Sequence, residues 1–301
     1  MQLNYYLLDV FTDTQMEGNP LAVVMKADHL DTWMMQKIAN EFSLSETIFV
    51  FEPKAGRNTA SVRIFTPLTE LPFAGHPIIG AAVWLGMTNR STAIRLEVKI
   101  GVVPCIMDRV NKRCGEARFR LPQLPQLVRA APETEKIAGT LGLTVEQIGF
   151  GDYMPVVYSA GIEYVLVPII NTEALSNIKL EKRGWDDVYG SDDVAIYAFC
   201  EAGQDSKNDF SARMFDLKLP RIEDPATGSA AAALIGLVAK INPDLNLKRQ
   251  YFIEQGVDVG RPSIIEMQVG KENGVLVHAG IGGKAILVGE GVLNLNWHET
   301  L

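Results

Sequence analysis

The sequence contains two apolar helical stretches of one kind, Gly75-His-Pro-Ile-Ile-Gly-Ala-Ala-Val-Trp-Leu85 and Gly228-Ser-Ala-Ala-Ala-Ala-Leu-Ile-Gly-Leu-Val-Ala239. The helices themselves are expected over Pro77–Leu85 and Ala230–Ala239, where apolar or small residues occupy every side. That pattern is typical of a buried helix, because a helix on the surface keeps a polar face. We therefore expect two domains, each with one buried helix in its middle.

The segments that lead into these helices also repeat. Arg63-Ile-Phe65 precedes Gly75, and Arg213-Met-Phe215 precedes Gly228. Chance is the alternative for so short a match, whereas an internal duplication explains all of its parts. The expected fold class is α+β, with two pseudo-symmetric halves that are each a mixed β-sheet wrapped around a central buried helix.

The expected domain boundaries follow from proline. Residues 122–133 contain three prolines, so they are expected to link an N-terminal half (1–121) to a C-terminal half (134–290), with 291–301 as a closing tail. An amphipathic helix capped by Asp31 is expected to end at Phe42 and to pack on a sheet. Strands are expected at Leu3–Val10, Leu21–Met25, Thr47–Phe51, Ser61–Phe65, Ile94–Ile100, Val102–Met107, Val156–Ser159, Tyr164–Val167, Val194–Phe199, Ser211–Phe215, Ile264–Val269, Val275–Ala279 and Ala285–Val288.

Composition excludes several classes of function. The 301-residue chain has a formal net charge of -8 and no long run of Lys or Arg, so we expect neither a nucleic-acid nor a membrane partner. Its three cysteines and four histidines lack the spacing of a zinc site, and no metal or cofactor is expected. Without a basic leader or an apolar run of ~20 residues, the expected location is cytoplasmic.

The two apolar helices begin at glycines, Gly75 and Gly228. A helix N-terminus carries unpaired N–H groups and partial positive charge, which suit a carboxylate or an enolate. Glycine also lets a ligand approach the main chain. If the halves are related by symmetry, the two helix starts would face one another across a cleft and hold a small acid. The alternative is that both glycines only make turns before buried helices.

Three side chains near these helix starts could carry chemistry. Glu46 lies between the amphipathic helix and a strand, where burial would raise its pKa for proton transfer; the alternative is a solvated loop residue. Asp224 precedes the second helix start, and His76 opens the first. Their alternatives are an Asx-type turn and a hydrogen-bonded core histidine. Ser229 lacks a nucleophile-elbow motif, and the stretch from Gly280 to Gly283 is expected to be a turn.

An ordered series of motifs resembles the PhzF-like phenazine-biosynthesis family, which shares the diaminopimelate epimerase fold. The series runs nearly end to end and consists of Asp9-Val-Phe-Thr12 with Gly18-Asn19-Pro20, Leu44-Ser-Glu46-Thr47, Arg63-Ile-Phe-Thr-Pro67, Glu70-Leu-Pro-Phe-Ala-Gly-His-Pro77, Glu223-Asp-Pro-Ala-Thr-Gly-Ser-Ala230 and Gln255-Gly-Val-Asp-Val-Gly-Arg-Pro262. The resemblance implies two similar halves with the active site between them, usually in a homodimer.

The resemblance also implies residue roles. In the phenazine isomerase, the glutamate that Glu46 matches takes a proton from C3 of trans-2,3-dihydro-3-hydroxyanthranilate and returns one at C1. His76 and Asp224 match residues that hydrogen-bond the substrate and relay protons. The residues expected to bind substrate are Asn19, Gly75, Gly228 and Ser229.

One departure from the epimerase relatives bears on mechanism. Amino-acid epimerases of this fold place a cysteine at each helix start, where this chain has His76 and Ser229. We therefore expect no two-thiol racemisation. The first hypothesis is a cofactor-independent isomerase; the alternatives are an amino-acid racemase without the cysteine pair and a non-catalytic binding protein.

Overall fold

The computed structural model describes residues 1–190, 194–203, 206–217 and 222–295. The chain divides into two compact units: unit 1 comprises Met1–Phe119 and Gly282–Leu301, and unit 2 comprises Arg120–Ile281. These boundaries differ from the expected ones, because residues 282–290 belong to unit 1. Residues 296–301 of the expected tail lie outside the described residues.

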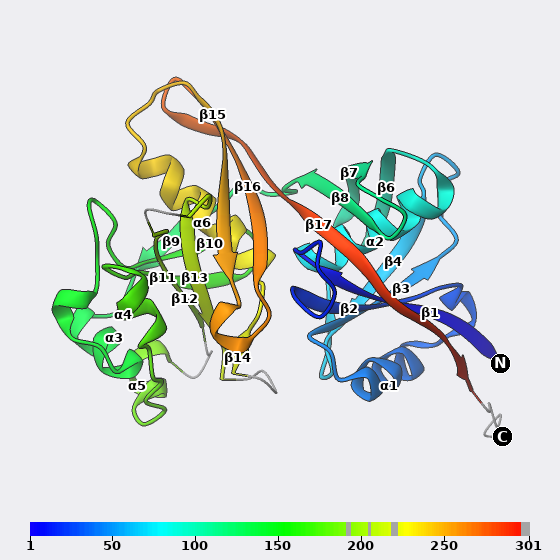
Figure 1. The fold of residues 1–301 in the computed structure, drawn as a ribbon, viewed down its shortest axis with the longest axis horizontal. Helices are drawn as coiled ribbons and strands as arrows, with labels where there is room; N and C mark the ends of the chain where they lie inside the picture. The colour runs from blue at the N-terminus through cyan, green and yellow to red at the C-terminus, as the bar shows by residue number, and fades with distance from the viewer. Residues whose placement is uncertain (191–193, 204–205, 218–221, 296–301) are drawn as a thin grey trace. The chain divides into compact units, whose positions relative to one another are not determined.

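Unit 1 is rich in strands, and Figure 1 shows its elements from dark blue to cyan-green, with the end of the chain in red. Its described helices and strands are β1 (Gln2–Val10), β2 (Asn19–Val24), α1 (Thr32–Phe42), β3 (Glu46–Phe51), β4 (Ala60–Phe65), β5 (Glu70–Leu71), α2 (Gly75–Asn89), β6 (Ala93–Val98), β7 (Gly101–Arg109), β8 (Cys114–Arg120) and the last part of β17 (Val275–Asn294).

Strand pairing closes the sheet of unit 1 on itself. From β1 the ladder passes through β2, β3, β4, β6, β7 and β8 to β17, and β17 pairs with β1 again. The pairs β2–β3 and β4–β6 are parallel, whereas β1–β2, β1–β17, β3–β4, β6–β7 and β7–β8 are antiparallel, so the sheet is mixed and barrel-like. Helix α2 packs against β1, β2, β3, β6 and β7 of this ring.

Close packing around α2 explains its composition. A Cβ added at Gly80 would lie 2.4 Å from Leu21 Cδ2, which confirms that a small residue lets the helix approach the strands. On the other side of the sheet, Phe49 and Phe65 pack with Met35 of α1. That the sheet surrounds α2 on every side stays a prediction.

Unit 2 is also a mixed sheet with helices. Its ladder runs β9–β10–β11–β12–β13–β15–β16, parallel at β11–β12 and β13–β15, and α6 packs against β9, β10, β11 and β16. The described elements are β9 (Gln126–Ala130), α3 (Thr134–Leu141), β10 (Val156–Ser159), β11 (Glu163–Pro168), α4 (Thr172–Ser176), α5 (Trp185–Tyr189), β12 (Ala195–Glu201), β13 (Phe210–Phe215), β14 (Glu223–Asp224), α6 (Gly228–Ile241), β15 (Leu247–Gln255), β16 (Ser263–Glu272) and the first part of β17.

Several expectations can be compared with these elements. The mixed, sheet-rich fold is confirmed, and so is the Asp31 cap, whose side chain accepts a hydrogen bond from Met34 N–H at 2.7 Å. The expected turn at Gly280–Gly283 is wrong, because these residues are buried within β17. Glycine is typical of turns, but it also occurs within strands where another part of the chain approaches closely. The sequence pattern alone does not separate these two cases.

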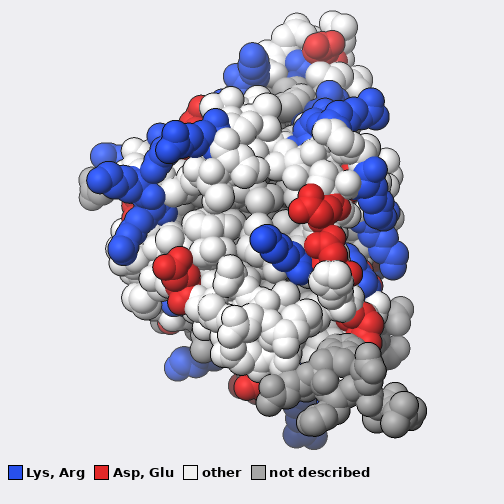
Figure 2. Space-filling model, turned by 90° about the vertical axis from the view of Figure 1, so that its right-hand side faces the viewer, with Lys and Arg blue, Asp and Glu red and all other residues white. Residues whose placement is uncertain are grey.

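Charged side chains of both signs occur on the surface. On the face in Figure 2, lysine and arginine stand in separate groups, with acidic side chains near several of them and uncharged surface between. Among the described residues, no helix has both the length and the apolar character needed to cross a bilayer.

Candidate active site

Helix α2 begins without a side-chain cap. Its first residue is Gly75, and the preceding Ala74 is extended (φ -151°, ψ 138°) and makes no capping hydrogen bond through its side chain. The helix starts two residues before the expected Pro77, which therefore occupies the third position. A proline is still tolerated there, because the first four N–H groups of a helix have no partner within it. This helix start remains suited to an anion.

Glu46 and His76 lie together in unit 1. Glu46 opens β3, His76 is in the first turn of α2, and Glu46 Oε2 is 3.2 Å from His76 Nδ1. Burial lowers the pKa of His76 from 6.5 to about 3, so the imidazole is neutral at pH 7. The contact therefore joins a neutral ring nitrogen to a carboxylate oxygen.

The two side chains differ in exposure. The side chain of His76 is 5% exposed and that of Glu46 is 17% exposed. His76 Nε2 is buried and has no hydrogen-bond partner among the described residues. With Nδ1 protonated, Nε2 is an acceptor, and a ligand O–H or N–H would satisfy it.

We expect His76 to make stability depend on pH. In the unfolded chain a histidine binds a proton near pH 6.5, whereas folded His76 does so only near pH 3. Between these values acid favours the unfolded state, so the free energy of unfolding falls by up to about 1.4 kcal/mol per pH unit as the pH drops. Above pH 6.5 this contribution is fully present.

The change His76→Gln should reduce the loss of stability between pH 7 and pH 5 by about 2 kcal/mol, measured by urea unfolding. His29→Gln offers a matched control, since it removes a histidine that is exposed at the surface. An equal loss in the wild type and in His76→Gln would contradict the assignment.

Asn19 lies on the same sheet as Glu46. It is fully buried at the start of β2, and Leu21 of β2 is beside Glu46 in the parallel ladder. Because alternate residues share one face of a strand, Asn19 and Leu21 are on the face where Glu46 lies. The ladder thus places Asn19 and Glu46 on one face, and the contact of Glu46 with His76 brings the histidine to the same region of unit 1. The role of Asn19 in substrate binding stays a prediction.

Asp224 and Thr227 are linked before α6 in unit 2. Asp224 is 7% exposed, and its Oδ2 accepts a hydrogen bond from Thr227 Oγ1 at 2.6 Å. Thr227 is the residue before Gly228, the first of α6, and its side chain makes no capping bond. The second helix start therefore resembles the first: a glycine opens a buried helix that has no side-chain cap.

Gln255 holds this turn in place. Its Nε2 donates to Asp224 O (2.9 Å) and Thr227 Oγ1 (3.1 Å), and its Oε1 accepts from Thr227 N–H (3.2 Å) and from the hydroxyl of Tyr197 (3.2 Å). Ser229 Oγ is 2.7 Å from the Tyr164 hydroxyl. The sequence predicted no role for Gln255 or Tyr164. The sequence did contain one signal for Gln255, which is the first residue of the motif at 255–262.

None of the three cysteines lies on α2 or α6. Cys105 is in β7, Cys114 in β8 and Cys200 in β12, and all three are buried. Burial raises the pKa of Cys105 and of Cys200 to about 12. Thiols held neutral in this way are poor bases and nucleophiles.

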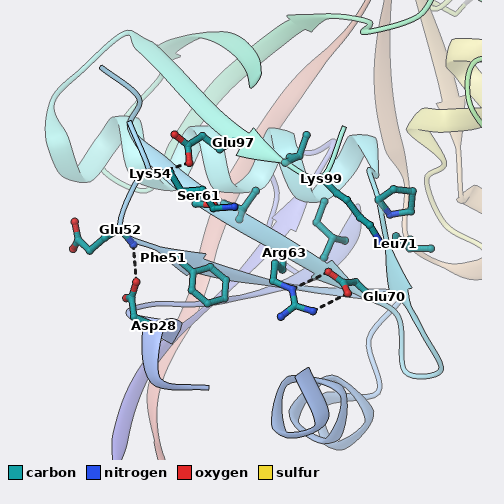
Figure 3. Close-up of a pocket in the computed structure, with 14 residues that line it drawn as sticks. Asp28, Phe51, Glu52, Lys54, Ser61, Arg63, Glu70, Leu71, Glu97 and Lys99 are labelled. Atoms are coloured by element: carbon teal, nitrogen blue, oxygen red, sulfur yellow. Dashed lines mark hydrogen bonds and ion pairs between the residues drawn. The ribbon is translucent and has the colours of Figure 1, made fainter. Parts of the chain in front are cut away.

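The structure thus brings Glu46 and His76 into contact in unit 1, with Gly75 on the same helix as His76 and Asn19 on the strand next to β3. In unit 2 it places Asp224 one short turn before Gly228 and Ser229. A hollow of about 580 Å³ on unit 1, shown in Figure 3, is lined by other residues, among them Arg63 and Lys99. That both sets of residues bind one substrate stays a prediction.

Comparison with known proteins gives matches over nearly the whole chain. The family described as phenazine biosynthesis-like protein matches residues 8–291. An uncharacterized isomerase of Mesorhizobium japonicum is 39% identical over 297 residues, which cover 96% of this chain and 98% of that protein. The trans-2,3-dihydro-3-hydroxyanthranilate isomerase of Pseudomonas fluorescens is 32% identical over 294 residues, with 97% and 99% covered.

A solved structure is similar as well. The Bacillus anthracis phenazine biosynthesis protein of the PhzF family has a TM-score of 0.87 at 25% sequence identity, covering 98% of this chain and 100% of that chain. The sheet-rich fold of this chain is therefore similar to that of a solved protein, and the pseudo-symmetric halves around central helices stay a prediction.

Proposed function

The chain belongs to the phenazine biosynthesis-like (PhzF) family, and we propose that it moves a proton within a small cyclic or amino-acid-like carboxylate, with Glu46 as acid and base. It is an isomerase of that family. The observation that carries the proposal is the contact of Glu46 with the buried, neutral His76 beside an uncapped helix start.

The chemistry needs one carboxylate that works twice. Glu46 as carboxylate takes a proton from a ring carbon, and the resulting carboxylic acid returns a proton to another carbon of the same face. His76 lies against the carboxylate, with Nδ1 3.2 Å from Glu46 Oε2, and would limit where the carboxylate can point. His76 Nε2 would accept a hydrogen bond from a hydroxyl or amino group of the substrate.

The named substrate of the Pseudomonas fluorescens relative is consistent with these groups. Trans-2,3-dihydro-3-hydroxyanthranilate offers a carboxylate for a helix start and hydrogen-bond donors for His76. We propose it as the first substrate to test. Asp224, Gly228 and Ser229 are proposed to bind this substrate too, and the homodimer and the cytoplasmic location remain predictions.

Racemisation by two thiols has little support. All three cysteines are buried in strands, and none lies at α2 or α6. A racemase of another kind would exchange the α-proton of a free amino acid in heavy water independently of Glu46. A non-catalytic protein would turn over none of these compounds.

The proposal is tested with trans-2,3-dihydro-3-hydroxyanthranilate that carries deuterium at C3, followed by proton NMR. We expect the deuterium to leave C3 and to appear at C1 or in the solvent, because Glu46 removes it. Breaking the heavier bond should also slow turnover severalfold. A product that retains all deuterium at C3, or a substrate that stays unchanged with the wild-type protein, would overturn the proposal.

A further inference from the structure

Each functional helix follows a strand of only two residues. In unit 1 the strand is β5 (Glu70–Leu71), and in unit 2 it is β14 (Glu223–Asp224). Three residues then separate each strand from its helix, Pro72–Ala74 and Pro225–Thr227. Both segments read Glu-x-Pro-x-x-Gly. Two ladder pairs give a strand little stability of its own, so something else must fix its position.

In each unit, an arginine on the neighbouring strand forms a bidentate ion pair with the glutamate of the short strand. Arg63 donates to Glu70 through Nε (2.8 Å) and Nη2 (2.7 Å), as the dashed lines in Figure 3 show. Arg213 donates to Glu223 with the same two atoms at the same distances. A bidentate pair fixes orientation as well as distance, because two parallel hydrogen bonds allow one arrangement.

The surroundings of the two pairs correspond in ladder register and in an aromatic contact, whereas Arg213 Nε also lies 3.7 Å from Asp258 Oδ2. Glu70 is opposite Phe65 in the β4–β5 ladder, and Glu223 is opposite Phe215 in the β13–β14 ladder. Each guanidinium also lies over the ring of the same phenylalanine, at 5.2 Å in unit 1 and 4.9 Å in unit 2. The same arginine–glutamate pair, in the same strand register, therefore precedes both helix starts.

Each arginine further ties its pair to a helix. Arg213 Nη1 donates to three backbone carbonyls at and just after the end of α4, those of Leu175 (3.1 Å), Ser176 (3.2 Å) and Ile178 (3.4 Å). Arg63 Nη2 donates to the hydroxyl of Thr32, the first residue of α1, at 3.0 Å. The short strand is thereby held between the sheet and a neighbouring helix.

We infer that Arg63 and Arg213 are positioning residues that act through Glu70 and Glu223 to fix the segments leading into α2 and α6. The inference rests on the proposed function for its consequence in catalysis. In unit 2 the link is short, because Asp224 directly follows Glu223 and accepts the hydrogen bond of Thr227. In unit 1 the segment from Glu70 leads to His76.

The experiment compares three charge-removing variants of one kind. Glu223→Gln and Glu70→Gln keep the shape of the side chain and remove one of the two charge-assisted bonds. Glu163→Gln is the control, since Glu163 pairs with Arg129 on the surface of unit 2, with side chains 41% and 48% exposed. Amide hydrogen exchange is measured by mass spectrometry, together with kcat/KM for trans-2,3-dihydro-3-hydroxyanthranilate.

We expect Glu223→Gln to speed exchange about tenfold in the first turns of α6, where Ala231 N–H donates to Thr227 O, and to leave α2 unchanged. Glu70→Gln should do the reverse. Both should lower kcat/KM about tenfold, and Glu163→Gln should change neither quantity. The Arg63–Glu70 pair is more exposed (31% and 23%) than Arg213–Glu223 (10% and 13%), so Glu70→Gln tests the inference even if Glu223→Gln fails to fold.

Two results would overturn the inference. One is unchanged exchange at both helix starts, and the other is faster exchange spread evenly over the whole unit, as expected of a purely structural pair. The proposed function fails separately: if the wild-type protein does not turn over the substrate, the exchange pattern still decides whether these arginines position the helix starts.

Discussion

Replacing Glu46 with glutamine is expected to lower kcat for trans-2,3-dihydro-3-hydroxyanthranilate about a thousandfold, because an amide can neither take nor return the proton. The change is nearly isosteric. Glutamine fills the same space beside His76, so the fold should persist. Turnover is measured by the loss of substrate deuterium at C3, and the thermal midpoint is measured beside it.

A matched control for this variant is Glu41→Gln, which changes an exposed glutamate of α1. It should retain full turnover. If Glu46→Gln also retained turnover at an unchanged thermal midpoint, Glu46 would not be the acid and base. If Glu46→Gln lost activity and also unfolded, the test would be made with Glu46→Asp. That variant keeps the carboxylate and should retain part of the wild-type activity.

Trp185→Ala is expected to reduce the free energy of unfolding of unit 2 by about 3–5 kcal/mol. Trp185 is 2% exposed, is the largest fully buried side chain among the described residues, and lies 4.7 Å from the Tyr189 ring in the core formed by α3, α4, α5 and the sheet. Its removal leaves a cavity that the neighbouring side chains cannot fill. Urea unfolding followed by circular dichroism measures the effect.

Trp33→Ala provides the comparison, since Trp33 is 60% exposed on α1 and its contact is with Lys37, 3.9 Å from the ring centre. That variant should cost about 1 kcal/mol or less. Equal losses in the two variants would show that the burial of Trp185 does not contribute as the structure indicates.

Parts of the fold could be predicted because they leave a local pattern. The helix capped by Asp31 was predicted to within a residue, since capping and periodicity are both properties of neighbouring residues. The two apolar helices were located, but α2 runs over Gly75–Asn89 and α6 over Gly228–Ile241, longer at both ends than expected. Helix ends depend on the polar residues that follow the apolar run, and these carry a weaker signal.

Other parts had no local pattern. Strands β8, β9 and β15 were missed, and all five residues of β9 are exposed. A strand that owes its existence to pairing, as β9 does with β10, shows little hydrophobic alternation. The expected linker therefore contains a strand that the sequence did not indicate.

The residues of the candidate site were likewise predicted only in part. Glu46 and His76 were selected through the resemblance, because nothing in composition or spacing says that two residues on different elements touch. Gln255 and Tyr164 were missed because their partners, Thr227 and Ser229, are far away in sequence. The Glu-x-Pro-x-x-Gly repeat was a signal within reach, since it sets Glu70 against Glu223 without any structure.

The long strand β17 has a consequence for synthesis on the ribosome. Unit 1 is built from both ends of the chain, and β1 pairs with β17 from Gln2 opposite Asn294 to Val10 opposite Ala285. During synthesis, one edge of β1 therefore stays unpaired until the whole of unit 2 has been translated. Open edges of this kind recruit other strands, so a newly made chain is exposed to aggregation in the interval before residues 285–294 emerge.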